Sequence, residues 1–211
     1  MNTDQLIRAM AADASRQWPI GAVVSLTLLA IGSLAIIVLI RVLGANPDFI
    51  ASMTPELFLL RQVSPLLLAI GSAAAALRLS RPDASAGSWY LVLAVALGLV
   101  GSLVGLELAT QPASEWRSAA MGRTSAACLV SIGLMSVPLL GGITWALARG
   151  ASTRPRLSGA LAGLLAGSVA AAIYAIHCTE YSPLFYVVWY GLGIVGATAV
   201  GSVIGARWLR W

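Results

Sequence analysis

Two cysteines, one histidine and one glutamate are the residues of this chain whose types and spacing could carry chemistry. Cys128 stands alone in the sequence, whereas His177, Cys178 and Glu180 lie close together fifty residues later. Two thiols can form a disulfide, and two thiolates with an imidazole and a carboxylate can hold a thiophilic metal ion. These residues could therefore form a redox or metal-binding group if the fold brings them together.

The elements that must position these residues are predicted from composition and hydropathy. The chain has 211 residues, of which 59% are hydrophobic and 10% are charged. Soluble domains average about a quarter charged residues, so a water-soluble fold is excluded. Six apolar blocks reach the roughly 20 residues that a helix needs to cross a bilayer. The predicted spans are 20–40, 57–77, 89–109, 126–148, 157–176 and 184–206.

The distribution of charge predicts how these spans are oriented. All thirteen basic residues are arginine, and they are scattered between the apolar blocks, so no direct contact with nucleic acid is expected. A cytoplasmic N-terminus places nine arginines inside and four outside, as the positive-inside rule requires. We therefore predict an all-α polytopic membrane protein with both termini cytoplasmic. It comprises a helical N-terminal segment, 1–19, and a bundle of six transmembrane helices, 20–211.

The two cysteines are predicted to lie at the same height in this bundle. A short inner loop joins spans four and five into an antiparallel hairpin, and Cys128 and Cys178 each lie 25 residues from Thr153 in that loop. Equal counts along two antiparallel helices mean equal heights, at about 1.5 Å per residue. The two sulfurs should therefore meet at the outer end of the hairpin. A stapling disulfide, a redox- or metal-responsive pair and two unrelated buried thiols all remain open.

The neighbours of Cys178 extend this hypothesis to a metal site. His177 supplies a nitrogen and Glu180 an oxygen, so Cys128, Cys178, His177 and Glu180 could together bind a heavy metal transiently. The alternative for His177 is an interfacial hydrogen-bond donor. No permanent cofactor is expected.

Two further patterns bear on packing. Arg61 and Glu107 lie near the outer ends of their spans, where each is expected to pair with the other or with a loop.

Small residues at intervals of four predict that spans five and six pack closely, and the same spacing recurs in span three. Such motifs could also serve assembly of several copies. The small residues are Gly159, Gly163 and Gly167 in span five, Gly193, Ala197, Gly201 and Gly205 in span six, and Gly101 and Gly105 in span three.

The N-terminal segment is expected to form one short helix over residues 3–17. A narrow apolar stripe on it is formed by Leu6, Ile7, Met10 and Ala14, and Asp4 and Arg8 are spaced for an i, i+4 pair. A helix this short is marginal alone in water, so it should become ordered on a partner. A helix lying on the membrane surface is the alternative, and the small apolar face favours a protein partner.

The sequence resembles the NrsF-type family of bacterial membrane anti-sigma factors along its whole length. The resemblance is carried by residues 3–13 (TDQLIRAMAAD), the six spans, a cysteine at the head of span four, and residues 177–185 (HCTEYSPLF) followed by Trp189 and Tyr190. Thr179 and Tyr181 stand where family members often have proline and aspartate, which removes one carboxylate from the outer turn.

This resemblance implies a function in transcription regulation. The protein would hold an extracytoplasmic-function sigma factor of the SigF type inactive at the bacterial inner membrane, and would release it under periplasmic metal or oxidative stress. Cys128 and Cys178 would carry sensing. The opening segment would bind the sigma factor through Asp4, Leu6, Ile7, Arg8 and Met10.

Two other functions fit the sequence less well. A small membrane transporter or channel is the alternative, although the spans carry no charge at their centres and show no clear inverted repeat. A membrane thiol oxidoreductase would need a second redox couple, which two cysteines cannot supply. The sequence shows no hydrolytic or phosphoryl-transfer motif, so we expect a protein that is not an enzyme.

Overall fold

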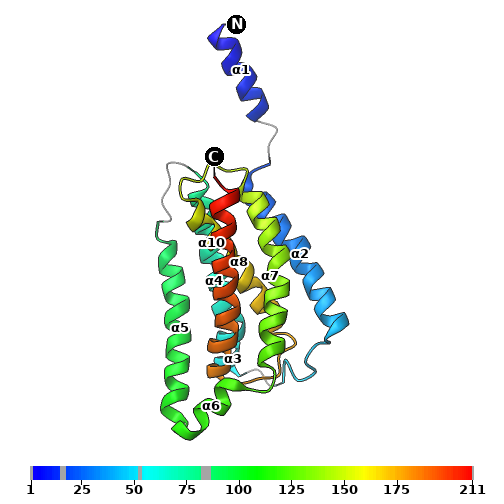
Figure 1. The fold of residues 1–211 in the computed structure, drawn as a ribbon, viewed down its shortest axis with the longest axis vertical. Helices are drawn as coiled ribbons and strands as arrows, with labels where there is room; N and C mark the ends of the chain where they lie inside the picture. The colour runs from blue at the N-terminus through cyan, green and yellow to red at the C-terminus, as the bar shows by residue number, and fades with distance from the viewer. Residues whose placement is uncertain (1, 15–17, 52–53, 82–86, 211) are drawn as a thin grey trace.

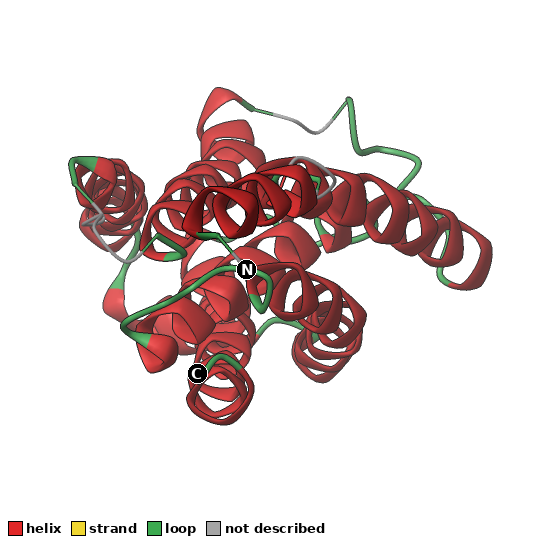
Figure 2. Ribbon diagram, turned by 90° about the horizontal axis from the view of Figure 1, so that it is seen from above, coloured by secondary structure: helices red, strands yellow, loops and turns green. Residues whose placement is uncertain are grey.

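The structure of the chain is a computed structural model that describes residues 2–14, 18–51, 54–81 and 87–210. Within these ranges it consists of helices and connecting turns, without a strand. Figure 2 shows this helical bundle from above. The all-α prediction is confirmed.

Six helices are long and apolar enough to cross a membrane. None of their ends differs by more than two residues from the predicted span. Two of the six helices each contain a π-helical turn, η1 or η2, near their start. The six are α2 (Ile20–Val42), the run of α3 (Pro55–Phe58), η1 (Leu59–Val63) and α4 (Ser64–Leu79), α5 (Trp89–Thr110), α7 (Ser125–Leu147), α8 (Pro155–Tyr174), and the run of α9 (Pro183–Phe185), η2 (Tyr186–Tyr190) and α10 (Gly191–Trp208).

Two shorter helices lie at opposite ends of the bundle (Figure 1). Helix α1 (Thr3–Ala14) begins where predicted, and the last three residues of the predicted helix, 15–17, lie outside the described residues. Helix α6 (Ala113–Met121) was not predicted. It turns into α7 at Gly122, whose φ of +52° favours glycine and whose added Cβ would strike the Phe185 ring.

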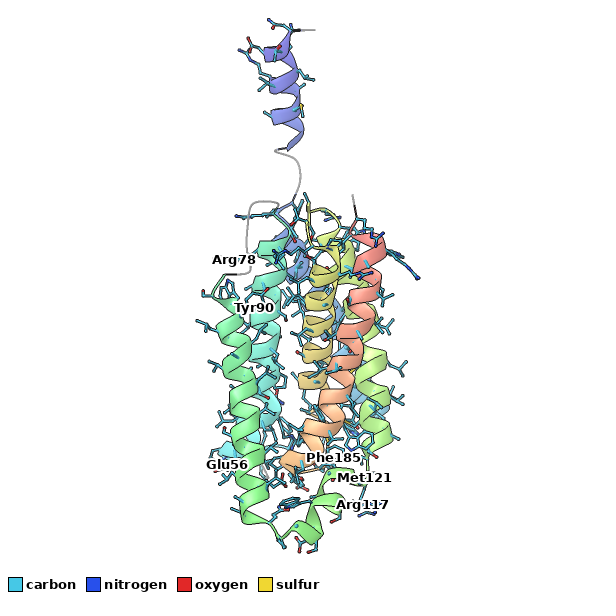
Figure 3. The ribbon with its side chains drawn as sticks, turned by 60° about the vertical axis from the view of Figure 1, so that its left-hand side comes forward. Glu56, Arg78, Tyr90, Arg117, Met121 and Phe185 are labelled. Atoms are coloured by element: carbon cyan, nitrogen blue, oxygen red, sulfur yellow. The ribbon has the colours of Figure 1, made fainter. Side chains whose placement is uncertain are left out.

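The bundle has two distinct ends, which we name by what they carry. The termini end holds the 149–155 loop and the end of α10, and α1 lies beyond it, whereas the cysteine end holds α3, α6, α9 and the start of α7 (Figure 1). Figure 3 labels Arg78 and Tyr90 at the termini end, and Arg117, Met121 and Phe185 at the cysteine end.

Helix α8 is the centre of the bundle. It packs against α10, α4, α7 and α2, and 14 of its 20 residues are buried. By contrast, only Ala96 and Glu107 are buried on α5, which packs mainly on α4. A helix of small residues can be surrounded by neighbours because their backbones approach closely.

The contact between α8 and α10 confirms the predicted small-residue packing. A Cβ added to Gly159 would meet the carbonyl oxygen of Gly201, and one added to Gly163 would meet that of Ala197. In span three, by contrast, Gly101 and Gly105 have no neighbouring atom within 4 Å of an added Cβ, so this motif does not pack against another described helix of the chain, and a role in assembly stays a prediction. Spacing alone does not decide whether a glycine faces a helix or open space.

Candidate functional site

The two cysteines lie at the cysteine end of the hairpin formed by α7 and α8. Cys128 is in the first turn of α7 and Cys178 follows the end of α8, and both side chains are buried, with exposed fractions of 0% and 1%. The thiol of Cys128 lies close enough to the thiol of Cys178 for their charges to interact, as their equal heights predict. Both cysteines are free thiols in this structure.

Arg61 holds the turn that carries Cys178. Its Nη2 atom donates to the carbonyl oxygens of Ala175, at 2.6 Å, and Cys178, at 2.5 Å. These carbonyls follow the C-terminus of α8, where the last carbonyl groups of a helix have no partner within the helix and the helix dipole is negative. The buried Arg61 cation therefore provides donors for these free carbonyl groups and complements the negative end of the helix dipole.

The surroundings of Arg61 are unusual for a charged side chain. The guanidinium has no exposed surface and lies 5.3 Å from the ring centre of Tyr186 and 5.6 Å from that of Phe49. Its Nε and Nη1 atoms are buried and make no hydrogen bond with any described residue. Arg61 sits on η1, and π-helical turns of this kind often mark functional positions.

The loop after α2 holds the same turn from the other side. Asn46 Nδ2 donates to the Cys178 carbonyl at 3.3 Å, and the backbone amide of Asn46 donates to Ile176 at 3.1 Å. His177 Nδ1 lies 2.9 Å from the carbonyl oxygen of Gly44, so this nitrogen must carry the proton. The histidine therefore acts as the hydrogen-bond donor that the sequence left open.

Glu180 joins the Cys178 segment to the start of α7. Its Oε1 atom accepts hydrogen bonds from the amide of Arg123 at 2.7 Å and from the amide and hydroxyl of Thr124 at 3.2 and 3.3 Å. A carboxylate is favourable at a helix N-terminus because it satisfies free amides and complements the helix dipole. Glu180 thus fixes the position of α7, whose first turn carries Cys128.

These hydrogen bonds also bear on the predicted metal site. Among the described residues, no group of three His, Cys, Asp or Glu side chains is arranged to hold a metal ion. In the arrangement that the structure describes, Cys128, Cys178, His177 and Glu180 do not form such a group, and metal binding by these residues stays a prediction. The carboxylate of Glu180 is engaged with α7, and the imidazole is turned to Gly44. The two thiols remain the candidate ligands.

Three tyrosines surround the two thiols. The hydroxyls of Tyr174, Tyr186 and Tyr190 are all within electrostatic range of Cys178. The rings of Tyr186 and Tyr190 lie 4.5 Å apart, and the Tyr186 hydroxyl donates to the Glu180 carbonyl at 2.9 Å. The Tyr190 hydroxyl is buried beside the Cys178 thiol and the Tyr186 hydroxyl. The thiols thus lie among aromatic rings and are shielded from solvent.

Glu107 is a second buried carboxylate at this end. It is 6% exposed and accepts from the Ser182 hydroxyl at 2.7 Å and from the Leu184 amide at 2.6 Å. Glu107 therefore binds the loop before α9, and Arg61 binds the turn after α8. The sequence predicted that Arg61 and Glu107 would pair either with each other or with a loop. In the structure each binds a loop or turn.

The structure places the predicted sigma-binding residues far from the cysteines. Residues 2–11 are all exposed, including the stripe of Leu6 (44%), Ile7 (58%) and Met10 (66%). Helix α1 shares no packed interface with another described helix. An exposed apolar stripe on an isolated helix is the expected form of a segment that binds in a partner's groove.

Sequence reasoning missed the roles of Arg61 and Asn46. The signal for Arg61 was a charge near the outer end of an apolar block, which indicates a buried partner without identifying it. Asn46 lies in a loop between two blocks, where an asparagine is ordinary. Only the fold shows that both contact one carbonyl group.

Comparison with known proteins bears on what this arrangement does. The family model described as NrsF, negative regulator of sigma F, matches residues 9–211. The anti-sigma-F factor NrsF of Caulobacter vibrioides is 33% identical over 215 residues, and the probable anti-sigma-F factor NrsF of Azospira oryzae is 33% identical over 216 residues. Both alignments cover 100% of this chain and of the relative. No solved structure matches the chain.

Proposed function

The chain belongs to the NrsF family of negative regulators of sigma F, and from that premise we propose that it is a membrane-embedded anti-sigma factor whose cysteine pair senses stress. Membership of this family makes the protein a regulator of a sigma factor and not an enzyme. The proposal adds that the sigma factor is of the extracytoplasmic-function type. It also adds that periplasmic metal or oxidative stress causes its release.

Insertion into the bacterial inner membrane is supported by the surface of the bundle. The six long helices have mean hydropathies between 1.6 and 2.8, and large apolar side chains such as Leu29, Leu91 and Leu134 are about two-thirds exposed. Such a surface would be costly in water and is suited to lipid. The nine arginines on the side of the termini favour a cytoplasmic N- and C-terminus.

Binding of the sigma factor is assigned to α1. Its exposed stripe of Leu6, Ile7 and Met10 would enter an apolar groove, and Asp4 and Arg8 would flank the contact. In the proposed orientation this helix extends into the cytoplasm, where the sigma factor is found. Family membership favours this function over the small transporter or channel that the sequence left open.

The observation that carries the sensing proposal is the pair of buried thiols at the end of the bundle opposite to α1. In a disulfide, two S–H bonds break and one S–S bond forms, while two electrons and two protons pass to the oxidant. A soft metal ion would instead displace the two thiol protons. Either event joins the start of α7 to the turn after α8.

The hydrogen bonds around Cys178 indicate how such an event would be transmitted. A displacement of Cys178 toward Cys128 moves a carbonyl group that both Arg61 and Asn46 hold. Because Arg61 belongs to the run that continues into α4, the strain reaches a second helix as well as the α7–α8 hairpin. Helix α4 and the α7–α8 hairpin both extend to the termini end, so the signal would change the contacts available to the sigma factor.

Release of the sigma factor from membranes tests the proposal. Membranes carrying the full chain and its sigma factor are treated with diamide or with Cd²⁺, and the sigma factor in the soluble fraction is measured. We expect release from the wild type and retention by the Cys128→Ser/Cys178→Ser variant. Ala162→Ser, which adds a hydroxyl at a buried position of α8, is the matched control and should release normally. Equal release from the double variant would overturn the sensing role.

A further inference from the structure

A cationic cavity lies at the termini end of the bundle. It has a volume of about 620 Å³ and is lined by Arg156, Arg207 and Arg210 together with Ser202, Val203 and Ala206. Arg156 is in the first turn of α8, and the other five residues come from the last turns of α10 and the tail that follows. No acidic side chain lines this cavity in the described part of the chain.

The packing of α8 on α10 explains why the arginines gather there. The backbone of α8 touches that of α10 where Gly205 meets Pro155 and Gly159, so the two helices carry no side chains between them at this level. The long side chains of Arg156 and Arg207 must then project to the side of the pair. Three positive charges held in one cavity repel one another, and a bound anion would relieve that repulsion.

The start of α8 adds a second feature that attracts an anion. Arg154 at the N-cap position provides no side-chain hydrogen bond to the first turn of this 20-residue helix. The free amides at a helix N-terminus and the positive end of its dipole form a ready site for phosphate or carboxylate. The guanidinium of Arg156 extends from this same turn.

The cavity wall indicates which anion fits. Guanidinium and hydroxyl groups line one part, whereas Val203, which is 56% exposed, and Ala206 line the other. Val203 precedes Arg207 by one turn of α10 and lies about 6 Å further from the helix end. An acidic protein segment would have to enter a cavity with this apolar wall, whereas a phospholipid presents a phosphate and an acyl chain in that order.

We propose that this cavity binds the headgroup of an anionic phospholipid, with the phosphate between Arg156 and Arg210 and an acyl chain along Val203. The proposal rests on the proposed insertion into a membrane, which places the arginines at the level of the cytoplasmic headgroups. The bound lipid bridges α8 and α10 at the end where α1 and the sigma factor lie. It thereby holds the termini ends of α8 and α10 together, and Cys178 follows the opposite end of α8.

Native mass spectrometry of the full chain in detergent tests this site. Phosphatidylglycerol, phosphatidylcholine and glycerol phosphate are titrated separately, so that an anionic lipid, a zwitterionic lipid and a soluble phosphate are compared. We expect tight retention of phosphatidylglycerol alone. The Arg156→Gln/Arg210→Gln variant should bind it about thirtyfold more weakly, because two headgroup contacts are lost.

Arg149→Gln is the matched control at the same end of the bundle. Its guanidinium lies 3.8 Å from the ring centre of Trp145 and does not line the cavity, so phosphatidylglycerol binding should be unchanged. Equal retention of phosphatidylcholine and phosphatidylglycerol, or an equal loss in Arg149→Gln, would overturn the proposal. Tight binding of glycerol phosphate alone would identify a soluble ligand instead.

Three further measurements separate this proposal from the proposed function. If the double variant captures less sigma factor but retains phosphatidylglycerol, the cavity binds an acidic protein surface and the lipid assignment is wrong. Resistance of the chain to carbonate extraction tests membrane insertion directly. The cysteine-to-serine variant should bind phosphatidylglycerol like the wild type, so failure of the sensing role would leave the lipid site standing.

Discussion

The two ends of the bundle use charged side chains in opposite ways. At the cysteine end, Arg61 and Glu107 are buried, and each is hydrogen-bonded to the backbone beside a helix terminus. At the termini end, Arg156, Arg207 and Arg210 are exposed and line one cavity. None of the described residues that line this cavity is acidic. The first arrangement fixes a geometry, and the second leaves charge available to a partner.

This difference teaches how a sensor and an output can share one small bundle. A buried charge is costly unless it is satisfied, so the segments that Arg61 and Glu107 bind have little freedom to move. The exposed arginines and the unpacked helix α1 impose no such restraint. Substitutions at the cysteine end should therefore change stability, whereas those at the termini end should change binding.

The largest effect is expected for Arg61→Met. Methionine matches the aliphatic part of arginine but leaves the Ala175 carbonyl unpaired and the Cys178 carbonyl held by Asn46 alone, so the free energy of unfolding should fall by about 2–4 kcal/mol. Unfolding by SDS titration in mixed micelles, followed by circular dichroism, measures this. Arg41→Met, at an exposed position, is the control and should change little. Equal stability of the two variants would show that burial of Arg61 has no structural role.

The next effect concerns α1 and should appear only in binding. Ile7→Asp/Met10→Asp places two charges on the apolar stripe and should weaken binding of the sigma factor about thirtyfold or more, as for interface hot spots. Affinity is measured by biolayer interferometry with the full chain in nanodiscs. Gln5→Asp lies on the opposite face of α1 and should bind normally. The comparison of ends fails if the stripe variant also loses stability.

Glu107→Gln should have a smaller effect on the cysteine end. The amide keeps one acceptor oxygen but loses the charge-assisted hydrogen bonds to Ser182 and Leu184, so the free energy of unfolding should fall by about 1–2 kcal/mol. Glu56→Gln, an exposed carboxylate at the same end, is the matched control. A loss in Glu56→Gln as large as in Glu107→Gln would indicate an effect of net charge and not of burial.

Asn46→Ala should produce the smallest measurable change. It removes one hydrogen bond to Cys178, which Arg61 continues to hold, and one from the exposed Asp48 amide, which water can replace, so a loss of about 1 kcal/mol is expected. The rate of Cys128–Cys178 disulfide formation with diamide, followed by thiol labelling, should rise because the turn is less restrained. An unchanged rate would show that Asn46 does not limit movement of the turn.

Much of this fold was predictable because hydropathy acts locally. Blocks of about 20 apolar residues separated by proline and arginine define six helices, and all their ends fall within two residues of prediction. Helix α6 was missed because it is short and carries no long apolar run. The π-helical turns η1 and η2 were missed because their residues suit an ordinary helix equally well.

Less of the candidate site was predictable. Equal counts from Thr153 correctly placed Cys128 and Cys178 at one height, since the rise of a helix is constant. The same counting could not show that Glu180 would bind the start of α7 or that His177 would bind Gly44. Those contacts depend on the rotation of each helix and on the path of loops.

What the sequence determined by itself is the number of long apolar helices, their ends and the height of each residue along the bundle, because these follow from hydropathy and helix geometry. Tertiary structure decided which faces meet. It buried Arg61 against the α8 terminus, turned Gly159 toward α10 and left Gly101 facing open space, although all three lie in similar apolar sequence. Rotation about a helix axis is set by the summed packing of neighbours, and no local pattern in the chain encodes that sum.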